Sequence, residues 1–345
     1  MLKLPIARLD ELFSLISAER ELYLPLEENG VVNFGRWAPG AEPKLDHLNT
    51  ARPVKDFFFA MTEDIASFKL KGKEIEVVED RVPTAPFALF GVRACDAASL
   101  DILDKVFLSD PVDTFYQARR DQGVVITAAC NAPEEICFCT AFPIDAADPG
   151  GDVATWRTAD ALYWAAKTDK GAALTEKVKH LFEDAGSAGE QAVAERKAAI
   201  KEILDRLPLG DISLEGFTGE ALMEMFDSPE WKKLYEPCIA CGTCTYICPP
   251  CHCYDIRDFD TGRGICRTRC WDSCMYSDFT LMAHGNPRTT QLERFRQRYM
   301  HKLIYFPDNN DGVYACVGCG RCVAKCPASM NIVKVIKALG VNNHV

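Results

Sequence analysis

Residues 238–249 read CIACGTCTYICP, and residues 316–327 read CVGCGRCVAKCP. Both stretches follow one pattern: two residues separate each of the first three cysteines, three residues separate the third from the fourth, and a proline follows. Three thiolates at this spacing can surround one corner of an iron–sulfur cube, while the fourth begins a helix that leads away. This is the pattern of domains that hold two 4Fe-4S clusters, in which the fourth cysteine of each run binds the other cluster.

The two runs therefore predict two 4Fe-4S clusters with exchanged ligands. Cluster I is expected to take Cys238, Cys241, Cys244 and Cys326, and cluster II is expected to take Cys316, Cys319, Cys322 and Cys248. We expect Gly242, Gly318 and Gly320 to let the backbone pass close to sulfur, and Pro249 and Pro327 to turn the chain after the last ligand. Zinc sites and disulfides are the alternatives. Zinc ribbons usually space their ligands as two pairs, so the pattern favours clusters.

Length and composition limit the class of protein. The chain has 345 residues, enough for two or three domains, and 17 cysteines, which indicate a reducing and anaerobic cytoplasm. The N-terminus, MLKLPIARLDELF, is not a signal peptide, and no run approaches the roughly 18 apolar residues of a membrane span. We expect a soluble cytoplasmic protein that reaches a membrane only through a partner.

The charge is distributed unevenly along the chain. The net charge is −11, but the segment from Glu236 onward carries 13 Lys and Arg against 9 Asp and Glu, a local excess of +4. The basic segment is therefore the one that holds the cysteine runs, and two clusters with about two negative charges each would roughly cancel it. The negative net charge of the whole chain argues against nucleic-acid binding.

Hydrophobic periodicity predicts an α/β domain over residues 1–170. We expect helices over 6–18 and 97–108, and strands over 74–79, 86–92, 123–130 and 161–167. A strand, a helix and a strand in that order suggest a right-handed βαβ unit. The aromatic run 57–59 is expected to pack in the interior.

Two further regions follow. Residues 171–230 are expected to form a helical connector, with one or two exposed helices over 174–206 around a loop at 186–190, and a short helix over 227–234. Residues 231–345 are expected to form a mostly helical, two-cluster ferredoxin-like domain. That domain would contain a long insert at 249–315, with a helical stretch that ends near Tyr305.

Nine cysteines lie outside the two runs, and four of them fall in the first domain: Cys95, Cys130, Cys137 and Cys139. Two of the four follow predicted strands. Because consecutive strands of a parallel sheet end at the same edge, these thiols can meet there and hold a third 4Fe-4S cluster. The alternatives are buried cysteines that bind no metal and pack as small hydrophobic residues, or a zinc site.

A second group outside the runs comprises Cys251, Cys253 and Cys274, which predict a further metal site. Cys266, Cys270 or His252 would complete it, as a cluster or as zinc, and plain packing is the other interpretation. On the helix of the insert, Arg294, Arg298 and Lys302 are four residues apart and share one face. They would either offset cluster charge, meet an acidic partner, or form a solvated basic face.

No other cofactor motif is visible: the sequence has no G-x-G-x-x-G after a strand, no phosphate-binding loop and no catalytic triad. The motifs that it does contain, GVRACD, ICFC, CIACGTCTYICPPCHCYD, WDSC and CVGCGRCVAKCP, resemble those of the iron–sulfur β subunit of cytoplasmic sulfhydrogenases. They are equally similar to those of the corresponding iron–sulfur subunit of anaerobic sulfite reductases. Related subunits occur in electron-bifurcating and transhydrogenase complexes.

The resemblance implies a non-catalytic electron-transfer subunit of an oxidoreductase complex. Such a subunit sits beside a flavoprotein that oxidises or reduces NAD(P)H, and passes electrons to a catalytic or ferredoxin-coupled partner. By motif, all the cysteines named so far look like family cysteines except Cys266 and Cys270, which have no assigned role. The alternatives are a subunit with its own metal active site at Cys251, Cys253 and Cys274, and a free electron carrier.

Overall fold

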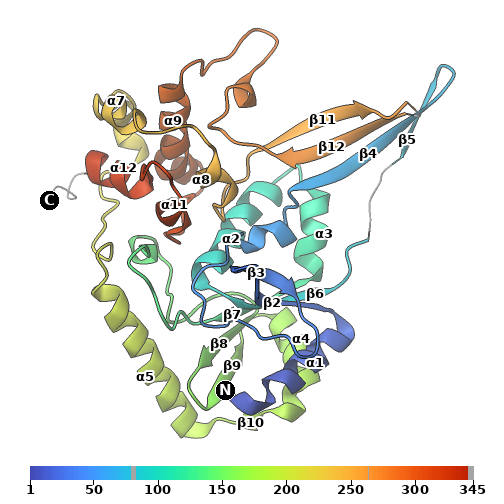
Figure 1. Cartoon of the computed structure of the whole chain (residues 1–345), viewed down its shortest axis with the longest axis vertical. Helices are drawn as coiled ribbons and strands as arrows, with labels where there is room; N and C mark the ends of the chain where they lie inside the picture. Colours follow the sequence, from blue (N-terminus) through green and yellow to red (C-terminus); the bar gives the residue numbers. More distant parts are fainter. Residues whose placement is uncertain (79–82, 263, 341–345) are drawn as a thin grey trace.

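The computed structural model describes residues 1–78, 83–262 and 264–340. Its centre is an eight-stranded sheet with the strand order β10-β1-β9-β8-β7-β6-β2-β3 (Figure 1). The bounds of these strands, in chain order, are β1 Leu2–Pro5, β2 Glu21–Glu28, β3 Val31–Arg36, β6 Phe87–Val92, β7 Gly123–Ala128, β8 Val153–Arg157, β9 Ala161–Ala166 and β10 Glu183–Asp184. No helix in the described ranges is long and apolar enough to span a membrane.

Four strands in the middle of this sheet are parallel, and the flanking strands are antiparallel. Strand β6 is buried at every residue, as its uninterrupted apolar run predicts. It leads through helix α2 (Ala94–Phe107) and helix α3 (Thr114–Gln122) to its parallel neighbour β7. The βαβ unit predicted from the sequence is therefore confirmed.

Helices cover both faces of the sheet because successive strand residues point to opposite sides. Helices α1 (Leu9–Glu19) and α4 (Asp169–Val178) pack on one face, against residues such as Ala88 and Val124. Helices α2 and α3 pack on the other face, against Leu89 and Val125. The aromatic run 57–59 joins this second core: Phe58 and Phe59 are buried, as expected.

Helix α5 (Gly186–Asp205) corrects one prediction. Residues 186–190 are its first turns, where the sequence suggested a loop. A Cβ at Gly189 would lie 3.0 Å from the Tyr163 ring, so the small residue there permits close packing of helix on sheet. The rest of the helix buries Val193, Ile200 and Leu204 against the same strands.

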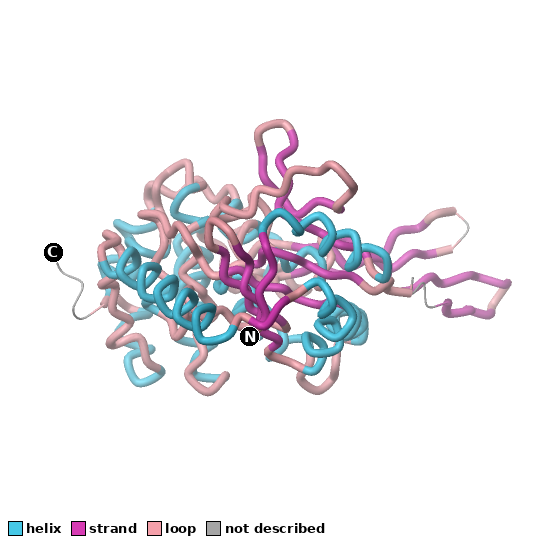
Figure 2. Tube along the Cα trace, turned by 90° about the horizontal axis from the view of Figure 1, so that it is seen from below, coloured by secondary structure: helices cyan, strands magenta, loops and turns pink. Residues whose placement is uncertain are grey.

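A second sheet has four antiparallel strands in the order β11-β12-β4-β5. Strands β4 (Thr62–Lys71) and β5 (Glu74–Val78) come from the N-terminal region, and β11 (Tyr254–Asp260) and β12 (Ile265–Trp271) come from the insert. This sheet, which we call the arm, projects from the body in both views (Figures 1 and 2). Residue 79, the end of one predicted strand, lies outside the described residues.

The arm also shows that the C-terminal region is less helical than expected. Its helices are α7 (Glu230–Tyr235), α8 (Thr243–Tyr246), α9 (Gln291–Met300), α10 (Phe306–Asn309), α11 (Arg321–Ala324) and α12 (Ile332–Leu339), and α6 (Leu222–Phe226) precedes them. The expected helix near 227–234 is present as α7. Because β12 pairs with β4, hydrogen bonds of one sheet cross the expected domain limits, and the three-domain division stays a prediction.

Candidate metal centres

The first candidate centre is a small cavity lined by Cys238, Cys241, Cys244 and Cys326. It lies between the loop that leads to α8 and the end of the second cysteine run. Phe295 and Tyr299 of α9 close its inner wall. The structure thus brings together the four thiols that the sequence assigned to cluster I.

The second candidate centre is a small cavity lined by Cys316, Cys319, Cys322 and Cys248. Three of these cysteines belong to the second run and Cys248 belongs to the first. The short helices α8 and α11 account for this exchange, because each leads its last cysteine away from the other three. The set is the one that the sequence assigned to cluster II.

Two glycines next to this cavity serve a different purpose from the one predicted. Gly318 and Gly320 have φ angles of +59° and +75°. A Cβ on either one would lie 2.4 Å from a carbonyl oxygen of the loop at Ile136–Phe138, so the close neighbour is backbone and not sulfur. Phe138 N donates to Gly318 O at 3.0 Å, which locks that loop onto the second cysteine run.

The third candidate centre is a small cavity lined by Cys95, Cys130, Cys137 and Cys139. These thiols meet beyond the carboxyl ends of β6 and β7, as the strand order predicts. Cys319 lines both this cavity and the second one, so the two centres are adjacent and share this residue in their walls. Asn49 fixes that wall by donating to Cys319 O at 2.8 Å.

Burial controls the chemistry of these thiols. It raises the pKa of Cys137 to about 12 and that of Cys139 to about 11. A buried thiolate is costly unless a cation compensates its charge, and iron supplies that charge when a cluster binds. A 4Fe-4S cluster requires four thiolates, one for each of its irons, and each of the three cavities offers at least four cysteines; the third is lined by Cys319 in addition to its own four.

A buried ion pair joins the second and third centres. Arg321 and Asp96 are 4% and 2% exposed, and two bonds of 2.7 Å connect the guanidinium to the two carboxylate oxygens. Arg321 Nε also donates to Thr50 O at 3.0 Å. Arg321 precedes Cys322 and Asp96 follows Cys95, so this pair fixes the cysteine-bearing helices α11 and α2 relative to each other.

Three of the cysteines outside the cavities, Cys251, Cys253 and Cys274, lie beside another cysteine. Cys248 donates a hydrogen bond to Cys251, which lowers the pKa of Cys251 well below its usual range, and nearby cations lower it further. Cys253 pairs with Cys274 in the same way. Within the described ranges, no three His, Cys, Asp or Glu side chains form a group able to hold a single metal ion.

The three side chains suggested to complete a site at Cys251 point elsewhere. Cys266 and Cys270 lie on β12 in the arm, opposite Phe259 and Asp255. The ring of His252 is buried, with Nδ1 3.0 Å from Pro250 O, and it packs against Phe306 and His301. None of the three cavities described above is lined by these side chains.

The basic helix face of the insert points inward. Arg298 donates to Cys251 Sγ at 3.5 Å, and Lys302 donates to Cys248 Sγ at 3.3 Å. Lys302 lies in the π-helical turn His301–Tyr305, which continues α9. Arg294 instead donates to the Met275 and Arg288 carbonyls. The solvated-face interpretation is therefore wrong for Arg298 and Lys302, which are both buried.

Sequence reasoning missed one cation of this group. Lys55 comes from the N-terminal region, is 2% exposed, and donates to Cys251 O at 2.9 Å. Its ammonium lies 3.9 Å from the centre of the Trp271 ring. The sequence contained no local signal for this role, because 196 positions separate Lys55 from Cys251.

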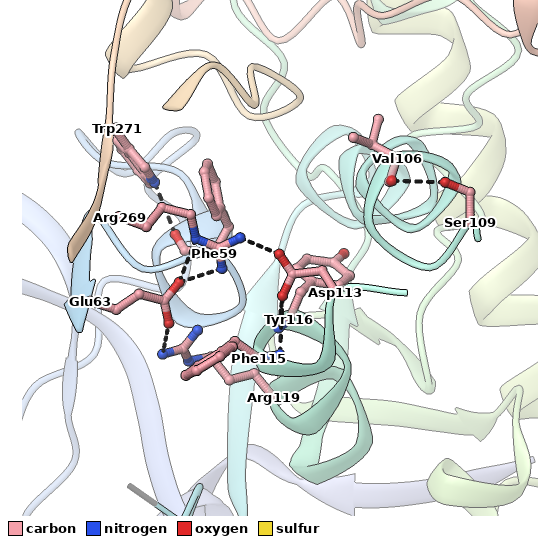
Figure 3. Close-up of polar contacts among 10 residues, drawn as sticks. All are labelled: Phe59, Glu63, Val106, Ser109, Asp113, Phe115, Tyr116, Arg119, Arg269 and Trp271. Atoms are coloured by element: carbon pink, nitrogen blue, oxygen red, sulfur yellow. Dashed lines mark hydrogen bonds and ion pairs between the residues drawn. The ribbon is translucent and has the colours of Figure 1, made fainter. Parts of the chain in front are cut away.

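A polar network at the base of the arm holds these parts together (Figure 3). Arg269 of β12 pairs with Glu63 of β4 and with Asp113, which caps α3. Arg119 of α3 pairs with the other oxygen of Glu63 at 2.7 Å. Trp271 Nε1 donates to Phe59 O at 3.2 Å. The insert is thus fixed against β4, helix α3 and the segment that carries Phe59.

Comparison with known proteins agrees with these features. The family model of the 4Fe-4S dicluster domain matches residues 237–330, which span both cysteine runs. Sulfhydrogenase 2 subunit beta of Pyrococcus furiosus is 33% identical to the chain over 332 residues, which cover 94% of each protein. The chain belongs to the family of sulfhydrogenase beta subunits. No solved structure matched.

Membership of this family makes the chain an iron–sulfur electron-transfer protein, and its dicluster domain holds two 4Fe-4S clusters. The family resemblance expected from the cysteine motifs is therefore confirmed. The match to the dicluster domain begins at residue 237, so it does not extend to the cysteines of the third cavity.

Proposed function

We propose that this sulfhydrogenase-type beta subunit is a conduit with three 4Fe-4S clusters, held by the cysteines of the three cavities. The observation that carries the proposal is that Cys319 lines two of them. A cluster bound at the second site would therefore lie next to one bound at the third. Bound clusters accept and donate single electrons.

The protein's own residues determine the surroundings of the clusters. They bury the thiols, hold the loops at fixed positions, and place hydrogen-bond donors on sulfur. Met330 N donates to Cys326 Sγ at 3.2 Å, and Glu134 N donates to Cys137 Sγ at 3.5 Å. Such donors stabilise negative charge on the ligand and so influence the reduction potential.

We propose that the electrons pass between a flavoprotein subunit that uses NAD(P)H and a catalytic partner, in a cytoplasmic complex. Support comes from the relative, whose name describes it as a subunit of a sulfhydrogenase. Isolation of the native chain together with a flavoprotein is the expected result. Elution as a monomer at native abundance would instead support a free electron carrier.

The cluster count tests the conduit directly. Anaerobically purified protein should contain about 12 iron and 12 sulfide per chain, without stoichiometric zinc. Cys95→Ala should lower the iron to about 8 and leave the signals of the other two clusters unchanged. Cys266→Ala is the matched control, because Cys266 lies in the arm, and its iron content should not change. About 8 iron per chain in the unsubstituted protein would show that the third cavity holds no cluster.

A second candidate function is a subunit with its own metal centre at Cys251, Cys253 and Cys274. The observation in its favour is that Cys253 and Cys274 are hydrogen-bonded to each other and that the buried Arg298 donates to Cys251 Sγ. An iron content of about 16 that falls by about 4 in Cys274→Ala would support it. An unchanged iron content in Cys274→Ala would leave these thiols as packing residues.

A further inference from the structure

Three buried cations converge on the Cys248 and Cys251 pair. Lys55 and Arg298 are each 2% exposed, and Lys302 is 4% exposed. They come from two distant regions of the chain: Lys55 from the turn before β4, and the other two from α9 and its π-helical continuation. Two of the three touch sulfur directly, at Cys248 and Cys251.

No carboxylate in the described part of the chain forms an ion pair with these three side chains. Asp56, the acid next to Lys55, pairs with Arg52. Among the described residues, no carboxylate oxygen lies within 4.0 Å of the charged nitrogens of the three side chains. Their remaining hydrogen bonds go to backbone carbonyls, such as Ala315 O from Lys302 at 2.7 Å and Cys244 O from Arg298 at 2.7 Å.

The arrangement leaves part of one guanidinium unsatisfied. Within the described ranges, Nε of Arg298 is buried and has no hydrogen-bond partner. Burying a cation without a counter-charge costs several kcal/mol. The compensating negative charge at this site therefore has to come from the sulfur ligands and from the group they hold.

The other two centres, as far as the described residues show, have fewer unpaired buried cations beside them: Arg298 also donates to Cys244 O next to the first cavity, and Arg93 lines the third. At the first cavity, the donors to sulfur include the uncharged backbone groups Ala240 N and Met330 N. At the third cavity, Arg93 donates to the backbone carbonyls of four residues, Leu45, His47, Leu48 and Ala129. The other cation near that cavity, Arg321, is neutralised by Asp96.

We propose that Lys302, assisted by Lys55 and Arg298, gives the Cys316/Cys319/Cys322/Cys248 centre the highest reduction potential in the chain. The inference rests on the proposed function, because it requires the clusters to be bound. Addition of one electron raises the negative charge of this centre by one, and no bond forms or breaks. A buried cation stabilises that extra charge strongly, because the surroundings have a low dielectric constant. An electron supplied by the partner's reduced flavin therefore resides at this centre before it moves on.

The test is a redox titration of the full chain with dithionite under anaerobic conditions, monitored by electron paramagnetic resonance. Lys302→Met should weaken electron binding at one cluster at least tenfold, which lowers its midpoint potential by about 59 mV. The midpoints of the other clusters should stay in place. Lys302→Arg, which keeps the charge, should keep the potential. Lys334→Met is the matched control, because Lys334 is an exposed lysine of α12.

Unchanged midpoints in Lys302→Met, or equal shifts at every cluster, would overturn the inference. If Lys302→Met loses the cluster, Lys55→Met provides the decision, because Lys55 contacts the backbone of Cys251 and leaves the ligand sulfurs in place. Lys55→Met must lower the midpoint potential of the same cluster. An unchanged midpoint in this variant would also refute the proposal. A lack of any cluster signal in the unsubstituted protein would refute the proposed function itself.

Discussion

The buried pair between Arg321 and Asp96 is the contact whose removal has the most predictable consequence. Asp96→Asn keeps the shape of the side chain and removes its charge, so the guanidinium stays buried without a counter-ion. Breaking such a pair costs about 3–5 kcal/mol. For 345 residues that unfold as one unit, the unfolding entropy is about 0.7 kcal/mol/K, so the thermal midpoint should fall by about 4–7 °C.

The assay is thermal unfolding followed by circular dichroism under anaerobic conditions, at one scan rate. Asp311→Asn is the matched control, because Asp311 also pairs with a residue of α2, Lys105, but is 91% exposed. An exposed pair contributes at most about 1 kcal/mol, which is about 1 °C here.

A double substitution separates the charge effect from packing. In Asp96→Leu with Arg321→Met, both charges are absent, and apolar pairs often replace buried ion pairs without loss of stability. The double variant should therefore recover most of the thermal midpoint. The reasoning is refuted if Asp96→Asn loses no more than Asp311→Asn, because the buried pair would then contribute no more than an exposed one.

Two further predictions concern the first centre and the acid sensitivity of the fold. Cys241→Ser should abolish the signal of the cluster in the first cavity and leave the second cluster reducible; equal loss of both signals would contradict the exchanged ligand sets. Burial lowers the pKa of His301 from 6.5 to about 4. Between pH 6.5 and about pH 4, the imidazole is therefore protonated in the unfolded chain but not in the folded one. Stability should therefore be full above pH 6.5 and fall by up to about 1.4 kcal/mol per pH unit below it. His301→Phe should flatten this dependence in pH-resolved thermal unfolding, and an unchanged slope would assign the acid sensitivity to other groups.

Several features of the protein follow from local sequence alone. The two cysteine runs define the dicluster domain because ligand spacing along the chain determines which irons the thiolates can reach. Likewise, the apolar run at 86–92 and the helical periodicity at 97–108 predict β6 and α2, because burial imposes a period on neighbouring residues. The convergence of four first-domain cysteines also follows, since parallel strands end at one edge.

Local patterns were misleading where tertiary packing decided the outcome. Residues 186–190 contain two glycines and suggested a loop, but they begin α5, where Gly189 allows the helix to approach Tyr163. In the same way, Gly318 and Gly320 are small because the loop at 136–138 packs against them. The loop at 136–138 is distant in sequence from Gly318 and Gly320, and Tyr163 lies on another element than Gly189, so composition near these glycines could not identify these neighbours.

The tertiary structure alone decided how the separate parts combine. Strand β4 pairs with β12 about 200 positions away, so the arm unites two regions that the sequence assigned to different domains. Lys55 reaches Cys251, and Asp96 reaches Arg321 across 225 positions. Periodicity and spacing in a sequence reflect the contacts that a residue makes with residues close to it along the chain. Pairing of strands and buried charges depends instead on which surfaces meet in three dimensions, and that is determined only when the whole chain is packed.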